Sequence, residues 1–413
     1  MPRESTKGTL PVLFSVVVLD LIGFGIVLPV LPFYARAYGA GGFELGALLT
    51  SFAAFQFLCA PFWGRLSDRI GRRPVMIITI AGTGLSLLWL GLADSMLDLF
   101  AARILAGVFA ANISVATAYV TDVTEESERT RWMGMIGASY AVGFVAGPAI
   151  GGLLSPTATE LGLRFTLIGG RAAELLSPFG YGIPMLFASA LAALNLVWAA
   201  LSLREPPGHV RGEGSGLPRR ETLRNPIVLR LCTIYFLFSL AVTQLESLFA
   251  FWMLDRFGYG ARQVATLLVA MAIVMGGIQG GAMRHLSRSF GERKLLLSGT
   301  FLLAVALATL PLAASVTLLL LPLLGCALGR AISHPAMLSM VSLAASPETR
   351  GSVMGTFQSS ASLARVLGPI GGGVLYDLSG SAPFLLAAVL MIGSASLARR
   401  LPAGEKSASE PPA

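Results

Sequence analysis

Apolar and polar positions along the chain alternate in long blocks rather than residue by residue. Twelve apolar windows fall near residues 10–32, 44–63, 75–93, 97–121, 134–154, 183–203, 227–252, 263–283, 294–313, 315–343, 352–376 and 381–398. Apolar stretches of roughly 20 residues are long enough to cross a bilayer as helices. The pattern therefore predicts an all-α integral membrane protein with 12 transmembrane helices.

The longest polar interruption, rich in Arg, Gly and Pro, divides the windows into two groups of six. We expect an N-terminal six-helix bundle over 1–203, a cytoplasmic linker over 204–226, a C-terminal six-helix bundle over 227–400 and a cytoplasmic tail over 401–413. The stretch 155–182 is an insert in an outer loop, and it is interpreted either as an amphipathic interfacial helix or as a loop without a role.

Composition agrees with lipid as the main solvent. Hydrophobic residues make up 54% of the chain and charged residues only 13%, against about 25% charged residues in average soluble proteins. A soluble enzyme, a nucleic-acid-binding module, a disordered protein and a disulfide scaffold are therefore disfavoured. The three cysteines lie singly in apolar runs, so no metal site is expected. The basic N-terminus and the first apolar window are interpreted as a retained span rather than a signal peptide.

The net charge of +8 is explained by the loops. Of the 30 Lys and Arg residues, 22 lie in the termini and loops on one side, 5 lie on the other side, and Arg103, Arg330 and Arg365 lie inside spans. Because basic loops stay in the cytoplasm, we expect both termini to be cytoplasmic and the protein to reside in the plasma (inner) membrane.

The two halves repeat each other. Residues 129–152 and 350–373 share one spacing: Arg, Gly five residues on, a small residue nine further, Gly-Pro four further, then Gly-Gly. Residues 64–74 and 284–294 form a second, weaker match. Parallel repeats imply two pseudo-symmetric bundles related by an axis along the membrane normal, with a cavity between them.

These motifs resemble a known family. The run Gly-Arg-Leu-Ser-Asp-Arg-Ile-Gly-Arg-Arg-Pro over 64–74 is similar to the signature loop of the major facilitator superfamily. The fifth span resembles the motif of its proton-coupled drug antiporters through Gly134, Gly143, Gly147, Pro148, Gly151 and Gly152. Residues 20–32 resemble the first helix of tetracycline-efflux-like pumps. Those pumps carry further membrane acids and a histidine where this chain has Ser86, Leu303 and Met275, so tetracycline itself is a poor match as substrate.

The resemblance implies a conformational latch formed by Gly64, Asp68, Arg69, Gly71, Arg72 and Asp122. Arg72 would pair with Asp122, and Asp68 would face the start of the eleventh span near 350–354. A simple positive-inside anchor is the alternative. The second copy has Arg288 in place of Asp68, so the latch is expected on one side only.

Gly143, Gly147 and Gly151 recur every four residues and therefore share one helix face. Small residues at this spacing allow two helices to approach closely. We expect the partner to be the eighth span in the other half, because its glycines at 276, 277, 280 and 281 offer a matching smooth surface.

Charged groups inside the spans are candidates for proton coupling, because they are costly there. Asp20 and Arg103 lie at similar depths and are predicted to touch, with Asp20 as the protonatable site and a structural ion pair as the alternative. Glu246 is a second acidic candidate, or a solvated residue at the outer mouth. His334, just before Pro335, could carry protons, although a hydrogen-bonded packing histidine is the favoured interpretation.

The candidate substrate cavity contains Phe24, Gln56, Tyr140, Phe249 and Trp252. Gln56 matches a substrate-contacting position of tetracycline-type pumps, whereas the aromatics could equally face lipid or pack. The predicted function is export of lipophilic small molecules by proton antiport with alternating access, hence multidrug efflux and antibiotic resistance. A proton-coupled importer of a sugar or organic acid is the alternative.

A membrane-embedded enzyme or sensor is the third possibility, and it lacks any catalytic motif or soluble domain. The expected partners are a small-molecule substrate and the lipid bilayer, without nucleic acid. We expect a monomer that needs no cofactor beyond a proton gradient.

Overall fold

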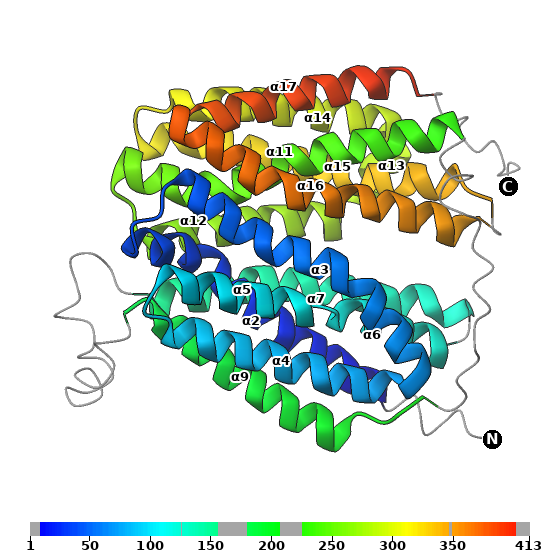
Figure 1. The fold of residues 1–413 in the computed structure, drawn as a ribbon. Helices are drawn as coiled ribbons and strands as arrows, with labels where there is room; N and C mark the ends of the chain where they lie inside the picture. Colours follow the sequence, from blue (N-terminus) through cyan, green and yellow to red (C-terminus); the bar gives the residue numbers. More distant parts are fainter. Residues whose placement is uncertain (1–8, 125, 156–179, 207–224, 347–348, 402–413) are drawn as a thin grey trace, which may run out of the picture. The chain divides into compact units, whose positions relative to one another are not determined.

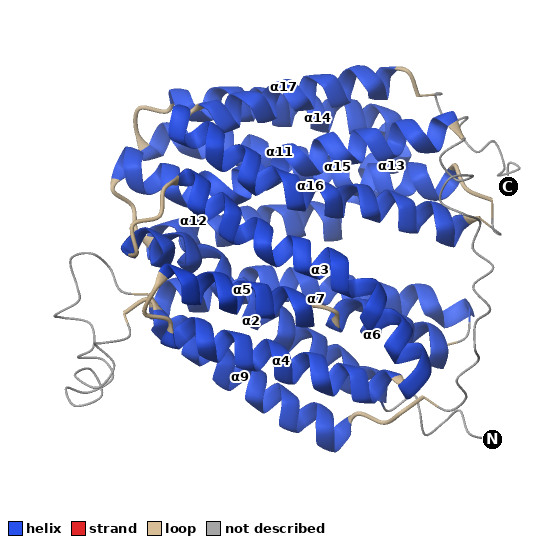
Figure 2. Cartoon of the chain, viewed as in Figure 1, coloured by secondary structure: helices blue, strands red, loops and turns tan. Residues whose placement is uncertain are grey.

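The computed structural model describes residues 9–124, 126–155, 180–206, 225–346 and 349–401. In this part of the chain every element is a helix and no strand occurs (Figure 2). Most of the predicted outer insert, most of the linker and the tail lie outside the described residues.

The helices follow the predicted windows in order (Figure 1). The first six spans are α2 (Thr9–Ala37), α3 (Gly42–Ile70), α4 (Arg72–Leu92), the pair α5 (Met96–Phe109) and α6 (Asn112–Val123), α7 (Glu126–Leu154) and α9 (Gly182–Ser202). The last six are α11 (Pro226–Phe257), the series α12 (Ala261–Gly277), η3 (Ile278–Ala282) and α13 (Met283–Phe290), α14 (Glu292–Thr309) with η4 (Leu310–Leu312), α15 (Val316–Leu343), α16 (Arg350–Leu378) and α17 (Ala382–Arg399).

Eleven spans among the described residues are long and apolar enough to cross a membrane. The remaining long helix is α16, whose 29 residues include six glycines, four serines and Arg365. Its length suffices for a bilayer, and its composition is that of a helix with a polar face. The 12-helix arrangement predicted from the sequence is therefore present, with α16 as its least apolar member.

The helices fall into two compact units. Unit 1 comprises residues 1–213 and 247–270, and unit 2 comprises residues 214–246 and 271–413. Thus the end of α11 and the start of α12 group with the N-terminal helices. The domain boundaries expected from the sequence remain a prediction.

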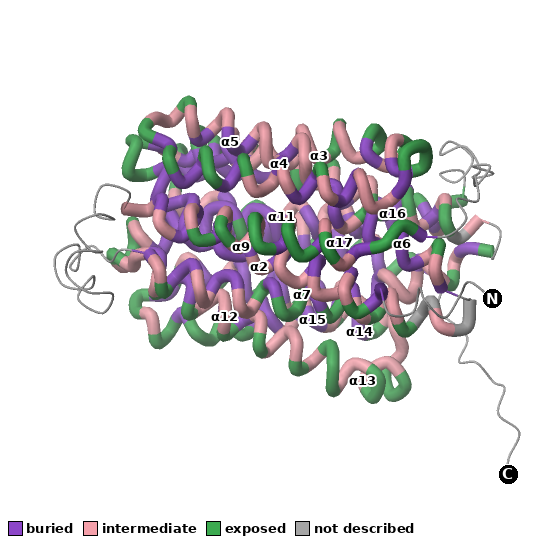
Figure 3. The backbone as a smooth tube through the Cα atoms, turned by 90° about the horizontal axis from the view of Figure 1, so that it is seen from below, coloured by how far each residue is buried: buried purple, intermediate pink, exposed green. Residues whose placement is uncertain are grey.

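Exposed positions lie along the helices (Figure 3), and many of them are large apolar side chains. On α9, for example, Leu194 is 66% exposed and Leu201 is 82% exposed. Soluble proteins rarely leave contiguous apolar surface in water. These side chains are suited to contact with lipid acyl chains, as the composition predicts.

The fourth span is interrupted, and neighbouring side chains compensate for the interruption. α5 ends at Phe109 and α6 begins at Asn112. From α3, the Trp63 indole donates to the carbonyl of Val108 at 2.5 Å and the Gln56 amide donates to the carbonyl of Ala110 at 3.3 Å. Carbonyl groups released from a helix must find donors inside a membrane, and α3 supplies two.

The glycine face of α7 packs against α2, not against the eighth span as the sequence analysis expected. A Cβ on Gly147 would lie 2.5 Å from the Cα of Gly25, and a Cβ on Gly143 would lie 2.5 Å from the Cβ of Leu21. Gly151 approaches Ile26 in the same way. The prediction of close packing is confirmed, but its predicted partner was wrong because α2 also carries a glycine that allows contact.

Only Gly152 of this motif reaches the eighth span, where it lies against Ala265 of α12. A Cβ added to any of the glycines at 276, 277, 280 and 281 would have no atom of the described residues within 4 Å. Gly280 and Gly281 belong to η3, a π-helical turn. Gly134 is likewise open, so the motif has one packed face and one free end.

We predict that Gly147→Ala destabilises the protein, since its methyl group would overlap the backbone of α2. Overpacking of a tight contact costs about 1–3 kcal/mol. The measurement is the thermal unfolding midpoint of the purified protein in detergent. Gly137→Ala on the same helix is the matched control, because nothing lies within 4 Å of its Cβ position. Equal midpoints for the two variants would contradict the assigned contact.

Candidate functional site

The turn between α3 and α4 is built on Gly71. Its φ of 109° lies in the region that favours glycine. A Cβ there would meet the carboxylate of Glu205 at 2.7 Å. That carboxylate accepts the backbone N–H of Arg72 at 2.6 Å and of Arg73 at 2.9 Å, so it caps the positive end of α4.

The role of Glu205 was not predicted from the sequence. The available signal was a single acidic residue directly after the sixth span, in a stretch otherwise rich in arginine. Its role became visible only when the end of α9 was placed beside the start of α4.

The predicted pair of Arg72 and Asp122 is present, with Nε donating to the carboxylate at 2.8 Å. The same guanidinium donates to Asp68 at 2.5 Å and to the Ser67 hydroxyl at 2.7 Å. Asp68 and Asp122 are therefore bridged by one arginine within unit 1. Arg69 is exposed, and Gly64 has no neighbour within 4 Å of a Cβ position among the described residues.

The predicted contact of Asp68 with the start of α16 stays a prediction, because it would join the two units.

Asp20 does not touch Arg103, and the predicted pair was wrong. Asp20 instead accepts a hydrogen bond from the Asn112 amide at 2.7 Å. Thr79 also bonds to Asn112. The predicted contact assumed that the fourth span is one unbroken helix. The break before Asn112 instead starts a second segment, whose first residue bonds to Asp20 on α2.

Arg103 lies over the ring of Phe52, with its guanidinium carbon 4.2 Å from the ring centroid. It is 5% exposed, and its Nε has no hydrogen-bond partner among the described residues. No carboxylate of the described residues lies within 4.0 Å of it either. A cation–π contact with an aromatic face partly compensates a buried cation.

In unit 2, Glu246 forms an ion pair with Arg330 at 2.6 Å. Neither interpretation of Glu246 drawn from the sequence included this partner. Because the two residues lie on α11 and α15, the pair links these helices.

His334 hydrogen-bonds to the Tyr235 hydroxyl at 3.2 Å. The Tyr235 ring stacks on Phe357 with a centroid separation of 4.0 Å and an interplanar angle of 5°. His334 is thus a hydrogen-bonded histidine, as the favoured interpretation held. Proton carriage by it stays a prediction.

The cavity candidates separate into two groups. Phe24 lies 5.8 Å from Phe52 and 6.3 Å from Phe144 between ring centroids, and Phe144 stacks on Tyr140. Phe24 and Tyr140 thus belong to one aromatic row that ends at Arg103. Phe249 and Trp252 are 3% and 4% exposed, so they pack in the interior. The Gln56 amide donates to the Ala110 carbonyl at the break between α5 and α6.

A further contact, which the sequence did not suggest, joins the ends of α2 and α11 in unit 1. Arg36 donates to Asp255 at 2.9 Å and lies 5.1 Å from the centroid of the Phe251 ring. It also donates to the carbonyl of Ala40 at 3.2 Å. We call Arg36, Phe251 and Asp255 the outer clasp, since these ends are on the predicted extracellular side.

The chain matches the Major Facilitator Superfamily over residues 13–288 and 280–413. It belongs to this superfamily. It is 30% identical to the tetracycline resistance protein, class C, of Escherichia coli over 391 residues, which cover 91% of each chain. It is 29% identical to multidrug resistance protein 1 of Bacillus subtilis (strain 168), covering 98% of this chain and 100% of the relative.

Two solved structures are similar in fold. The human organic anion transporter MFSD10 (TETRAN) aligns with a TM-score of 0.67 and 25% identity, covering 96% of this chain and 100% of that one. A bacterial homologue of the human lysosomal transporter Spinster, in an inward-facing occupied conformation, aligns with a TM-score of 0.77, 19% identity, and coverage of 97% and 98%. At this identity, the similarity to the second structure is evidence of a shared major facilitator fold only.

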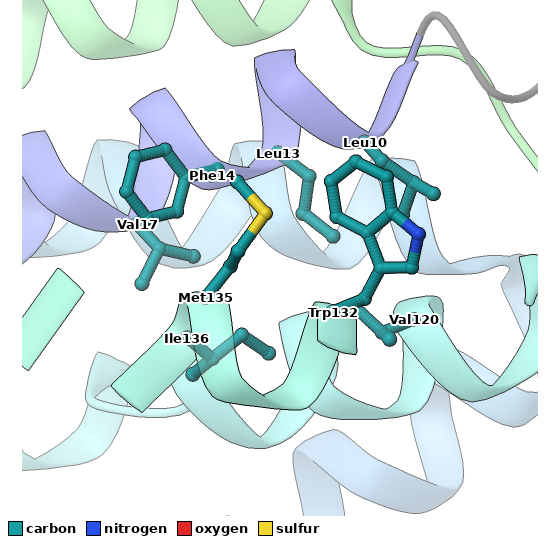
Figure 4. Close-up of a pocket in the computed structure, with 8 residues that line it drawn as sticks. All are labelled: Leu10, Leu13, Phe14, Val17, Val120, Trp132, Met135 and Ile136. Atoms are coloured by element: carbon teal, nitrogen blue, oxygen red, sulfur yellow. The ribbon is translucent and has the colours of Figure 1, made fainter. Parts of the chain in front are cut away.

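Among the described residues of this major facilitator protein, no group of three or more His, Cys, Asp and Glu could hold a metal ion. A small pocket lies where α2, α6 and α7 meet, and all its side chains are apolar (Figure 4). It is lined by Leu10, Leu13, Phe14, Val17, Val120, Trp132, Met135 and Ile136. None of the predicted site residues lines it, so it adds no chemistry to the site.

We predict that Gly71→Ala destabilises this superfamily member more than Gly39→Ala does. Both glycines have φ in the glycine region, 109° and 81°, so both variants carry backbone strain of about 1–2 kcal/mol. Only Gly71 has the Glu205 carboxylate at its Cβ position, whereas Gly39 has nothing within 4 Å. The thermal midpoint in detergent measures the difference, and equal losses would contradict the Glu205 cap.

Proposed function

We propose that this protein exports lipophilic small molecules by proton antiport with alternating access. Its tetracycline and multidrug resistance relatives support an efflux role. Both termini are then cytoplasmic, as the distribution of Lys and Arg indicates, and the protein works in the plasma (inner) membrane of its cell. A proton gradient supplies the energy, and no cofactor is needed.

The observation that carries the proton-coupling proposal is the environment of Asp20. Its partner is the neutral amide of Asn112 at 2.7 Å, and none of the described residues places a cation within 4.0 Å of it. A carboxyl group in an ion pair must break that pair when it takes up a proton. Asp20 can gain or lose a proton against an amide, which can hydrogen-bond to either form.

The same environment gives Arg103 a separate role. Because it rests on Phe52 at the end of the aromatic row, it contributes a positive field to unit 1 without holding the Asp20 carboxylate in place. In this scheme the proton binds at Asp20, and Arg103 anchors α5 to α3.

Alternating access requires the outer clasp to separate. Arg36 and Asp255 come from the first and seventh predicted spans, one from each sequence repeat. Both side chains are about 40% exposed, and an ion pair this accessible contributes little stability. It can therefore open and reform during a transport cycle.

We expect Asp20→Asn to lose proton-driven export while the protein stays folded, because asparagine keeps the shape and hydrogen bonding but cannot titrate. The assay is movement of tetracycline and of ethidium in proteoliposomes with an imposed pH gradient. Exchange of labelled for unlabelled substrate, without a gradient, should persist. Glu44→Gln, a solvent-accessible carboxylate at the start of α3, is the matched control. Full gradient-driven export by Asp20→Asn would overturn the coupling role.

The imposed gradient also tests direction. If the substrate moves with the protons rather than against them, the protein is an importer.

We also expect that cross-linking the outer clasp stops transport. The native cysteines are first replaced by serine, and cysteines are placed at 36 and 255 and bridged with a short bifunctional methanethiosulfonate reagent. Transport should fall to background and return when the bridge is reduced. The control pair is Gly84→Cys with Ser189→Cys, on the neighbouring helices α4 and α9 of unit 1, where the native Ser189 hydroxyl reaches the Gly84 carbonyl at 2.9 Å. Undiminished transport with the 36–255 bridge would rule out opening at the clasp.

A further inference from the structure

The charges inside unit 2 do not balance. Among the described residues of unit 2, three acidic or basic side chains lie more than ten residues from both ends of their helices: Glu246 on α11, Arg330 on α15 and Arg365 on α16. The single carboxylate is used, since Glu246 pairs with Arg330 at 2.6 Å. Arg365 has no hydrogen bond and no carboxylate within 4.0 Å among the described residues. One guanidinium therefore remains without a counter-charge at membrane depth.

Arg365 and Arg330 lie at matching depths. Arg365 is 15 residues from the start of α16 and Arg330 is 13 residues from the end of α15, and residues 344–349 join these two ends. At 1.5 Å per residue each lies about 20 Å along its helix from that side, near the middle of a bilayer. Both guanidinium groups are close enough to His334 to act on it electrostatically, and Arg365 also acts on Tyr235.

The neighbouring aromatic groups cannot neutralise Arg365. Tyr235 is committed to His334 through its hydroxyl and to Phe357 through its ring. None of these three side chains offers a negative charge. The described groups near Arg365 thus include no anion, which favours an anion arriving from outside.

The surface of α16 around Arg365 is polar and open. Gly351, Gly355, Gln358, Ser362 and Arg365 recur at spacings of three and four and therefore share one face. Every one of these residues is exposed or half-buried, and the two glycines have no atom within 4 Å of a Cβ position among the described residues. A lipid-facing stripe of this composition would be unfavourable. The face instead suits a water-accessible path, in which the Gln358 amide adds a hydrogen-bond donor on the same face as the guanidinium, while the Ser362 hydroxyl donates to the backbone carbonyl of Gln358 at 3.1 Å.

We propose that Arg365 binds the anionic group of the transported molecule, so that lipophilic organic anions such as carboxylates and sulfonates are its substrate class. This inference rests on the proposed function as a small-molecule transporter, but not on its direction or its coupling ion. The planar fork of arginine donates two parallel hydrogen bonds to a carboxylate. Glu246 does not compete for it, because Arg330 already holds that carboxylate.

The test compares two probes that differ only in charge, pyrenebutyrate and its neutral amide. Equilibrium binding to the purified protein in detergent is followed by pyrene fluorescence. We expect the wild-type protein to bind the carboxylate at least about tenfold more tightly than the amide. Arg365→Gln should abolish that preference while changing the amide affinity by less than about twofold. Arg365→Lys should give an intermediate preference, since it keeps the charge and loses the fork.

Arg256→Gln is the matched control, an exposed arginine at the end of α11, and it should keep the wild-type preference. A wild-type protein that binds the carboxylate no more tightly than the amide, or binds neither, overturns the proposal. So does a preference that survives in both Arg365 variants.

Transport of the same probes separates this inference from the proposed function. An Arg365-dependent carboxylate preference without proton-driven movement leaves the anion site standing and removes proton antiport. Proton-driven movement of tetracycline or ethidium, without any preference for the carboxylate, leaves the antiporter standing and removes the anion site.

Discussion

Hydrocarbon offers a protein neither hydrogen bonds nor counter-ions, and the structure depends on meeting that condition locally. Where the fourth span breaks, the side chains of Trp63 and Gln56 on α3 reach the carbonyl groups that the helix releases. Once those carbonyls are satisfied, α6 can begin at Asn112 and bring its amide to Asp20. The break is therefore part of how the carboxyl group of α2 is accommodated.

The same condition explains three kinds of compensation for charges inside the spans of the described residues. Glu246 and Arg330 neutralise each other. Arg103 lies on the face of Phe52, and Asp20 is held by an amide. Arg365 alone finds no partner of any of these kinds, which is why its exposed, polar helix face carries meaning. A charged side chain inside a membrane span points to a function most strongly when the protein supplies no partner for it.

The close contact between α2 and α7 holds these two helices together. In unit 1 the missing side chains of Gly25 and Gly147 let α2 and α7 touch through their backbones. The helix that carries Asp20 is thereby fixed against a long neighbour. At the end of α2, by contrast, Arg36 meets Asp255 through exposed side chains that can part. The proposed transport cycle would use both the close α2–α7 contact and the opening of the outer clasp.

The sequence alone determined the class of the protein, because apolar windows of bilayer length, basic loops and a repeated glycine pattern follow directly from the demands of lipid. The resemblance of residues 64–74 to a family signature loop also implied the Arg72–Asp122 pair, which the structure contains.

The tertiary structure decided which residue meets which. Depth along a helix can be counted from a sequence, but direction around the helix and interruptions within it cannot, so Asp20 was matched to Arg103 instead of Asn112. The glycines of α7 predicted that another helix packs closely against this face. Only the packing of the structure shows that this helix is α2. Glu205 and Asp255 became significant only when segments far apart in the chain lay side by side, because ion pairs and caps are properties of three-dimensional proximity rather than of local pattern.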